Sequence, residues 1–248
     1  MDMDGMVLGF FLLAAFLGAV TTGVAGFAMG LVVSGIWLHI LTPVQTVSLM
    51  VSYSVLLQGY SLWKLRRALS WRKVAPFIIS GTIGVPIGAM LLAYINPAYL
   101  RAGVGLLLLL YSIYYLVRPV LKPVQGRLPA DIGIGFFNGV LGGLTGLVGI
   151  IVVIWCQLRG WPKDVQRTVF QPVIIATSAM TAVWLGASGA VTGDTVKLFL
   201  LGLPMLLAGT WVGMKLYGRL DEAGFRKLVL ILLLLSGVFL VVPVSIFR

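Results

Sequence analysis

Apolar stretches separated by short polar or basic connections follow one another along the whole chain. Several of them reach the roughly 20 residues that an α-helix needs to cross a bilayer. The pattern therefore predicts an all-α polytopic membrane protein. The expected apolar segments are residues 6–41, 43–63, 74–94, 101–116, 132–158, 165–185, 196–217 and 225–246.

Glycines interrupt two of these segments, at residues 23–30 and 138–149. Each glycine weakens a helix by roughly 1 kcal/mol relative to alanine. A bilayer tolerates broken backbone only inside protein or beside a cavity. The glycines therefore predict two discontinuous helices, of the kind that transporters place at a binding site near the midplane. The alternative is close helix packing, because Gly139 and Gly143 have the spacing of small packing residues.

The two halves of the chain resemble each other, which indicates a duplication. Four landmarks recur in order, at offsets of 119 to 125 residues. The matched pairs are residues 23–26 with 143–146, 42–43 with 161–162, 84 and 88 with 209 and 213, and 100–101 with 225–226. We therefore expect a first repeat at 1–120, a basic proline-rich linker at 121–130 and a second repeat at 131–248.

The positive charges favour one topology over another. If each interrupted segment crosses the membrane, lysine and arginine divide almost equally between the two sides. If each is a hairpin, only Arg101, Lys197 and Arg248 lie opposite the other basic residues, which is the bias that the positive-inside rule describes. The expected fold is thus two inverted repeats, each with one glycine-broken hairpin and three transmembrane helices. The connections expected in the cytoplasm are residues 64–73, 118–130, 159–167 and 215–227.

The composition excludes an ordinary soluble domain. Hydrophobic residues make up 60% and charged residues 10% of the 248 positions, with a mean hydropathy of +1.06. Soluble domains average about 25% charged residues. The net charge of +11 lies in short connections between spans, where it sets orientation, so no nucleic-acid partner is expected. With a single Cys156 and a single His39, neither a metal site nor another cofactor is expected.

A polar helical face follows the second interruption and has a counterpart in the first half. In the second half the face consists of Asp164, Arg167, Thr168 and Gln171, at spacing i, i+3, i+4 and i+7. In the first half it consists of Gln45, Ser48 and Ser52. Two related polar faces beside two helix breaks predict a shared polar site.

The chemistry of this site points to an anion. Arg167 is a fixed cation whose forked donors suit sulfonate, phosphate or carboxylate oxygens. Exposed backbone N–H groups at Gly142, Gly143 and Thr145 would add anion affinity. The expected substrate-binding residues are Arg167, Gln171, Thr145, Gly142, Gly143, Asn138, Gln45, Ser48, Ser52, Gly23 and Gly26.

Several of these residues have plainer interpretations. Arg167 lies near the predicted membrane edge, where it could extend to the lipid headgroups or pair with Asp164. Ser48 and Ser52 could serve helix packing, and Asn138 could cap the break. Aromatic residues near the segment ends are expected in an interfacial belt, namely Trp37, Trp63, Trp71, Trp155, Trp161 and Tyr217.

The sequence does not indicate an enzyme. It has no carboxylate pair deep in a span, no histidine cluster and no Ser-His-Asp set. It also lacks the Gly-x-x-x-x-Gly-Lys-Ser/Thr signature of a nucleotide-hydrolysing P-loop.

Four motifs, taken in order, suggest a family. They are Gly-Val-Ala-Gly-Phe at 23–27, Thr-Pro at 42–43, Gly-Gly-Leu-Thr-Gly-Leu-Val-Gly at 142–149 and Arg-Gly-Trp-Pro-Lys-Asp-Val-Gln-Arg-Thr-Val-Phe-Gln-Pro at 159–172. Over essentially the whole chain this arrangement resembles the sulfite exporter TauE/SafE family. The second break departs from the commoner Gly-x-Gly-Gly-Gly form of that family, because Leu144 and Thr145 stand between its glycines.

The resemblance implies a carrier of small sulfur-containing anions, such as sulfite, sulfoacetate, thiosulfate or taurine-derived compounds, in the inner membrane of a bacterium or archaeon. We expect a secondary transporter that works by alternating access. It would contact the lipid bilayer, and a homo-oligomer is compatible with it. The alternative is a non-transporting membrane subunit or assembly factor, in which the glycines are packing surfaces.

Overall fold

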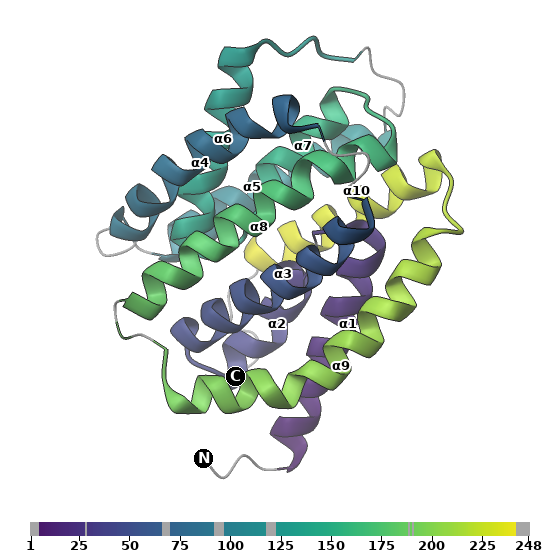
Figure 1. Ribbon diagram of the computed structural model, residues 1–248. Helices are drawn as coiled ribbons and strands as arrows, with labels where there is room; N and C mark the ends of the chain where they lie inside the picture. The colour runs from purple at the N-terminus through teal and green to yellow at the C-terminus, as the bar shows by residue number, and fades with distance from the viewer. Residues whose placement is uncertain are drawn as a thin grey trace.

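A computed structural model of the chain describes residues 5–27, 29–65, 70–91, 97–117, 123–187, 189 and 191–241. These residues form helices joined by short turns, with no β-strand among them (Figure 1). The helices are α1 (Gly5–Ala25), α2 (Met29–Ile40), α3 (Pro43–Leu65), α4 (Trp71–Leu91), α5 (Pro97–Val117), α6 (Leu128–Thr145), α7 (Ile150–Leu158), α8 (Lys163–Ala187), α9 (Gly193–Tyr217) and α10 (Glu222–Val241).

The two predicted helix breaks are confirmed. The first separates α1 from α2, and the second separates α6 from α7. Gly26, Gly146 and Gly149 have φ angles of 88°, 72° and 91°, in the left-handed region that glycine adopts without steric cost. The second break is confined to residues 146–149, so it begins later than the glycine run itself.

Most helix ends agree with the sequence pattern. The Thr-Pro pair at 42–43 opens α3, where Thr42 Oγ1 accepts a hydrogen bond from Gln45 N at 3.2 Å and so caps the helix. The predicted linker 121–130 is shorter in the structure, because α6 begins at Leu128 with a proline in its first turn. Predictions for Trp63, the Arg101 side chain and Arg248 fall outside the described part of the chain.

Each broken segment folds back on itself as a helical hairpin. In the first, Trp37 of α2 stacks on Phe11 of α1 at 5.1 Å between ring centroids, and its Nε1 donates to Phe11 O at 3.3 Å. In the second, Val124 N, just before α6, donates to Leu158 O at the end of α7 at 2.9 Å. The predicted place of Trp37 in an interfacial belt is wrong, because its side chain is fully buried inside the hairpin.

The helices of the two halves pack against each other in exchanged pairs. Helix α1 packs on α9, and α6 packs on α4. Helices α3 and α8 lie side by side through the centre, with α4 and α6 on one flank and α1 and α9 on the other (Figure 1). Helix α5 packs against α10. The pair of α1 with α9 is thus the counterpart of the pair of α6 with α4, and α3–α8 and α5–α10 each join elements at matching positions in the two halves.

The pair of α4 with α6 depends on glycine. A Cβ atom added to Gly84 would lie 2.3 Å from Phe136 O, and one added to Gly88 would lie 2.0 Å from Val140 O. Real Cβ atoms do not approach a carbonyl oxygen so closely. The backbones of α4 and α6 can therefore touch only where the side chain is absent.

The pair of α9 with α1 repeats this arrangement. Added Cβ atoms on Gly209 and Gly213 would lie 2.5 Å from Phe16 O and 2.2 Å from Val20 O. The two contacted residues have the same types as their counterparts on α6, 120 positions further along the chain. These four glycines therefore allow close helix packing, whereas Gly26, Gly146 and Gly149 interrupt helices.

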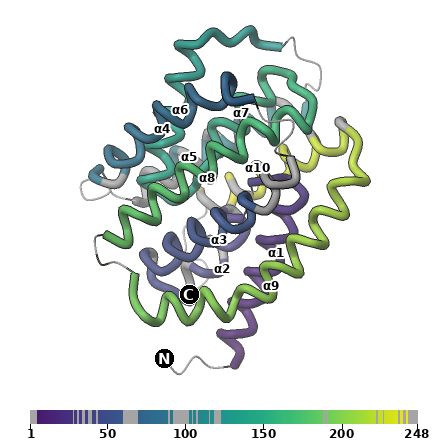
Figure 2. The backbone as a smooth tube through the Cα atoms, in the orientation of Figure 1, coloured from purple at the N-terminus to yellow at the C-terminus, as the bar shows by residue number. Residues whose placement is uncertain are grey.

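The basic connections meet at one end of the molecule. Lys73, at the start of α4, lies over the Trp161 ring at 5.2 Å from its centroid, and Lys163 Nζ donates to Leu220 O. Val124 is bonded to the end of α7 on the same side. Residues from all four connections predicted to share a side therefore lie together; the turns after α7 and α9 can be followed at this end in Figure 2.

The outer surface suits hydrocarbon. Among the described helices, α1, α8 and α9 are long and apolar enough to cross a membrane. Large apolar side chains on the outside are more than half exposed, including Ile79, Ile83, Leu110, Leu200, Leu207 and Trp211. A soluble protein rarely exposes so much contiguous apolar surface. The chain is therefore a helical membrane protein.

We predict that Gly88→Ala destabilises the fold by about 1–3 kcal/mol, the usual cost of overpacking, because the new methyl group would enter the backbone of α6. The control is Gly103→Ala on α5, where a Cβ meets no described atom within 4 Å. Thermal unfolding in detergent should show a lower melting temperature for the first variant alone. Equal melting temperatures would contradict the close contact of α4 and α6.

Candidate functional site

Arg167 points into the protein, toward the first helix break. It lies about one turn into α8, and its side chain is 1% exposed. Its Nη2 donates to Gly23 O, in the last turn of α1, at 3.0 Å. Carbonyls in that turn have no helical partner, and the negative end of the helix dipole attracts a cation there. Arg167 therefore does not extend to the headgroups; it caps the end of α1.

Gln171 lies one turn further along α8 and completes the contacts of Arg167. Its side chain is fully buried. With the amide oxygen facing the guanidinium, the orientation that satisfies both groups, that oxygen accepts from Nε at 3.1 Å and from Nη2 at 3.2 Å. The structure thus brings Arg167, Gln171, Gly23 and Gly26 together, as the sequence predicts.

Tyr217 connects this group to the basic end of the molecule. Its ring, at the end of α9, lies 4.0 Å from Arg167 Cζ in a cation–π contact. Its hydroxyl donates to the carboxylate of Asp164. Arg167 and Asp164 therefore share Tyr217 and form no direct ion pair. The sequence predicts Tyr217 in an interfacial belt. Its contact with Arg167 joins residues 50 positions apart, so spacing along one helix does not reveal it.

Gln58 also holds the first break and was missed from the sequence. Its Nε2 donates to Gly26 O from α3, and its side chain is 1% exposed. An unpaired amide costs free energy in apolar surroundings, so a glutamine deep in an apolar segment signals a bonded, interior side chain. The same signal could have found Gln58.

At the second break, two side chains bond to the local backbone. Asn138 is fully buried, and its Oδ1 accepts from Gly149 N at 3.1 Å. Thr145 Oγ1 donates to Leu141 O at 2.8 Å and accepts from Leu147 N at 3.1 Å. Both side chains therefore shape the loop between α6 and α7.

The backbone donors at this break differ from those expected. Gly142, Gly143 and Thr145 lie in the last turn of α6, so their N–H groups belong to the helical hydrogen-bond pattern and are not exposed. The helix that begins at the break is α7, and its first-turn N–H groups have no helical acceptor. The open donors are thus those of residues 150–152.

The expected residues on α3 have different surroundings. Gln45 Oε1 accepts from Thr42 N at 3.2 Å and from Thr42 Oγ1 at 3.1 Å, which completes a capping box at the start of the helix. That oxygen is therefore already used. Ser48 is buried, and Ser52 is half-buried.

The two breaks adjoin. A Cβ added to Gly30, at the start of α2, would lie 3.6 Å from Leu147 Cδ2 and 3.9 Å from Gly146 O. The first break is held by Arg167 from the second half, and the second break contacts Val47 from the first half. The centre of the molecule is thus a junction of two broken helices, each contacted by the other half.

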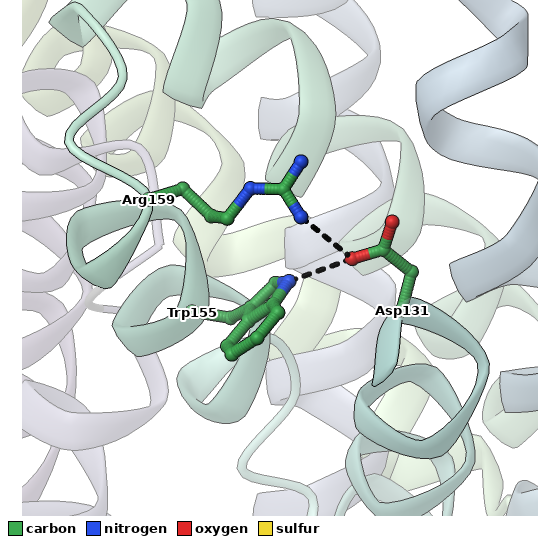
Figure 3. Close-up of polar contacts among 3 residues, drawn as sticks. All are labelled: Asp131, Trp155 and Arg159. Carbon is green, nitrogen blue, oxygen red and sulfur yellow. Dashed lines mark hydrogen bonds and ion pairs between the residues drawn. The ribbon is translucent and has the colours of Figure 1, made fainter. Parts of the chain in front are cut away.

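A polar cluster holds together the ends of the second hairpin. Asp131 of α6 accepts from Trp155 Nε1 at 2.7 Å and pairs with Arg159 Nη1 at 3.4 Å (Figure 3). Arg159 also lies over the Trp161 ring, 4.8 Å from its centroid. The ion-paired side chains are only 18% and 16% exposed. In the first hairpin, the buried stack of Phe11 on Trp37 occupies the corresponding position.

The fold and the central junction define a helical membrane protein with two glycine-broken hairpins. The model of the sulfite exporter TauE/SafE family matches residues 11–240. The chain belongs to this family, which is a family of membrane transporters for sulfur anions. Comparisons with curated proteins and with solved structures found no match.

We predict that Arg167→Met destabilises the protein by about 2–3 kcal/mol, because the Gly23 carbonyl and the Gln171 amide lose a charged donor inside the fold. Arg72→Met, at an exposed position of α4, is the matched control and should unfold like the wild type. Thermal unfolding in detergent measures both. If the two variants melt together, the guanidinium does not stabilise the end of α1.

Proposed function

We propose that the protein is a secondary carrier or facilitator of small sulfur-containing anions, such as sulfite, thiosulfate or organosulfonates. One observation carries the proposal: a buried arginine is held at a helix break in the centre of a transporter-family fold. Among the described residues no carboxylate bonds to it directly. Its positive charge is therefore available to attract an anion.

We place the binding site where the two breaks adjoin. At the first break, Arg167 contributes its positive charge and Gln171 its amide, both from α8. Asn138 and Thr145 line the second break. The N-terminal end of α7 points its partial positive charge into the same junction. The remaining members of the proposed site are Gly23, Gly26, Gly142, Gly143, Ser48, Ser52 and, at its edge, Gln45.

We further propose that the two halves are inverted repeats with cytoplasmic basic connections. The main helix pairs support this, because α1 with α9 becomes α6 with α4, and α3 with α9 becomes α8 with α4, when the halves are interchanged. The clustering of residues from four basic connections at one end supports the orientation under the positive-inside rule. Family membership agrees with placement in a bacterial or archaeal inner membrane.

Alternating access would then come from movement of one repeat against the other. The two hairpins differ in a way that suits this mechanism. The first is closed by a fully buried aromatic stack, and the second by a partly exposed ion pair at the basic end. Because water reaches part of this ion pair and none of the aromatic stack, we propose that the second hairpin is the one that opens.

The test is flux into liposomes that contain the purified protein. We expect saturable uptake of labelled sulfite, thiosulfate or sulfoacetate above protein-free liposomes, with acetate as the comparison anion. The same sulfur anion should raise the melting temperature progressively as its concentration increases, because it binds the folded state. Absence of both effects for every sulfur anion would refute the proposal and favour a non-transporting membrane subunit.

A second prediction concerns the ion pair of the hairpin. Asp131→Asn keeps an oxygen acceptor for Trp155 and removes the charge that faces Arg159. We expect flux to rise with little change in apparent affinity, because opening becomes easier while the site is unaltered. The matched control is Asp194→Asn, which removes the exposed pair with Lys197. Flux unchanged in both variants would show that this end is not a gate.

A further inference from the structure

The start of α7 has donors without acceptors in a buried place. Gly149 occupies the N-cap position, and no side chain caps it. Ile150 is 2% exposed and Val152 is fully buried. The first helical hydrogen bond runs from Val153 N to Gly149 O, so the helical pattern itself supplies no acceptor for the N–H groups of residues 150–152. Buried N–H groups left in this state cost free energy that an acceptor would recover.

Asn138 adds an independent donor at the same point. Its side chain is fully buried, and its Oδ1 is fixed by Gly149 N at 3.1 Å. Within the described residues its Nδ2 has no hydrogen-bond partner. Because the amide is planar and one end is bonded to the N-cap, the unpartnered end is also held at the start of α7. A buried amide donor without a partner thus lies beside the N-terminus of α7.

Among the described residues, no carboxylate approaches the glycines of the break. The side chains that approach them are Val47, Val148, Ile174 and Thr177. Asn138 Oδ1 already accepts a hydrogen bond. The ligand that fits such a set carries negative charge and acceptor oxygens but no proton of its own. An oxyanion that keeps a proton, such as hydrogen phosphate, would leave its own O–H unpaired there.

Arg167, by contrast, already has its partners. Its donors contact Gly23 O and the Gln171 amide, and its face is covered by the Tyr217 ring. The charge of Arg167 remains effective over several ångströms in a low-dielectric interior. It therefore acts on the junction as a fixed positive charge and as the cap of α1.

We propose that Asn138 Nδ2 and the N-terminal turn of α7 bind the oxyanion head of a fully ionised sulfur anion and select it against protonated oxyanions. This assignment rests on the proposed transport function. Within it, Asn138 is the specificity-determining ligand and Arg167 is a positioning residue.

The experiment measures equilibrium binding of thiosulfate and of inorganic phosphate to the detergent-purified chain by calorimetry at pH 7. Asn138→Asp keeps an oxygen for Gly149 N–H, replaces the free donor with an acceptor and adds a repelling charge. We expect wild type to bind thiosulfate at least about tenfold more tightly than phosphate, and the variant to lose at least about tenfold in thiosulfate affinity. Gln125→Glu, the same chemical change at an exposed position before α6, should bind like wild type.

Hydrogen exchange of the wild-type protein provides a second readout that needs no variant. Thiosulfate should slow exchange of the amides of residues 149–152. Protection confined to residues 23–30 and the start of α8 would overturn the assignment and place the anion on Arg167. Equal thiosulfate affinity in Asn138→Asp and Gln125→Glu would also overturn it, while flux through the wild type would leave the transport function standing. If wild type neither binds nor transports any sulfur anion, the transport function itself fails.

Discussion

The structure depends on satisfying the backbone groups that two broken helices leave free inside an apolar protein. Four side chains meet this requirement: Arg167 bonds to Gly23 O, Gln58 to Gly26 O, Asn138 to Gly149 N, and Thr145 to Leu141 O and Leu147 N. Without such partners a break in this setting would cost several kcal/mol. The first break takes its charged partner from the other half of the chain. The site and the fold are therefore held by the same bonds.

Much of the fold could be predicted because its signals are local. Apolar runs, the Thr42 cap and the two glycine clusters each report on their own segment, and the helices begin and end near them. The glycine cluster could not show which residues adopt the left-handed conformation, so Gly142 and Gly143 were expected in the break although α6 continues through them. That choice depends on packing against α8 and α4, which sequence spacing does not report.

The candidate site was predicted in part, for a similar reason. Arg167 and Gln171 share a helical face, so their contact follows from spacing alone. The contact of Arg167 with Tyr217, and that of Gln58 with the first break, join residues far apart in the chain. Gln45 was matched to Asp164 by position, but its neighbour Thr42 makes it part of a helix cap.

The exchange of partners between the halves has a consequence for biosynthesis. Helix α1 leaves the ribosome before the other described helices, yet it packs on α9, whose last residue is Tyr217. Gly213, which touches Val20, is made almost 200 residues later. The first hairpin therefore lies in the lipid without its main partner until α9 has been made. Assembly of this protein is therefore a late event. A chain truncated before α9 would leave the packing face of α1 uncovered, where cellular quality control could recognise it.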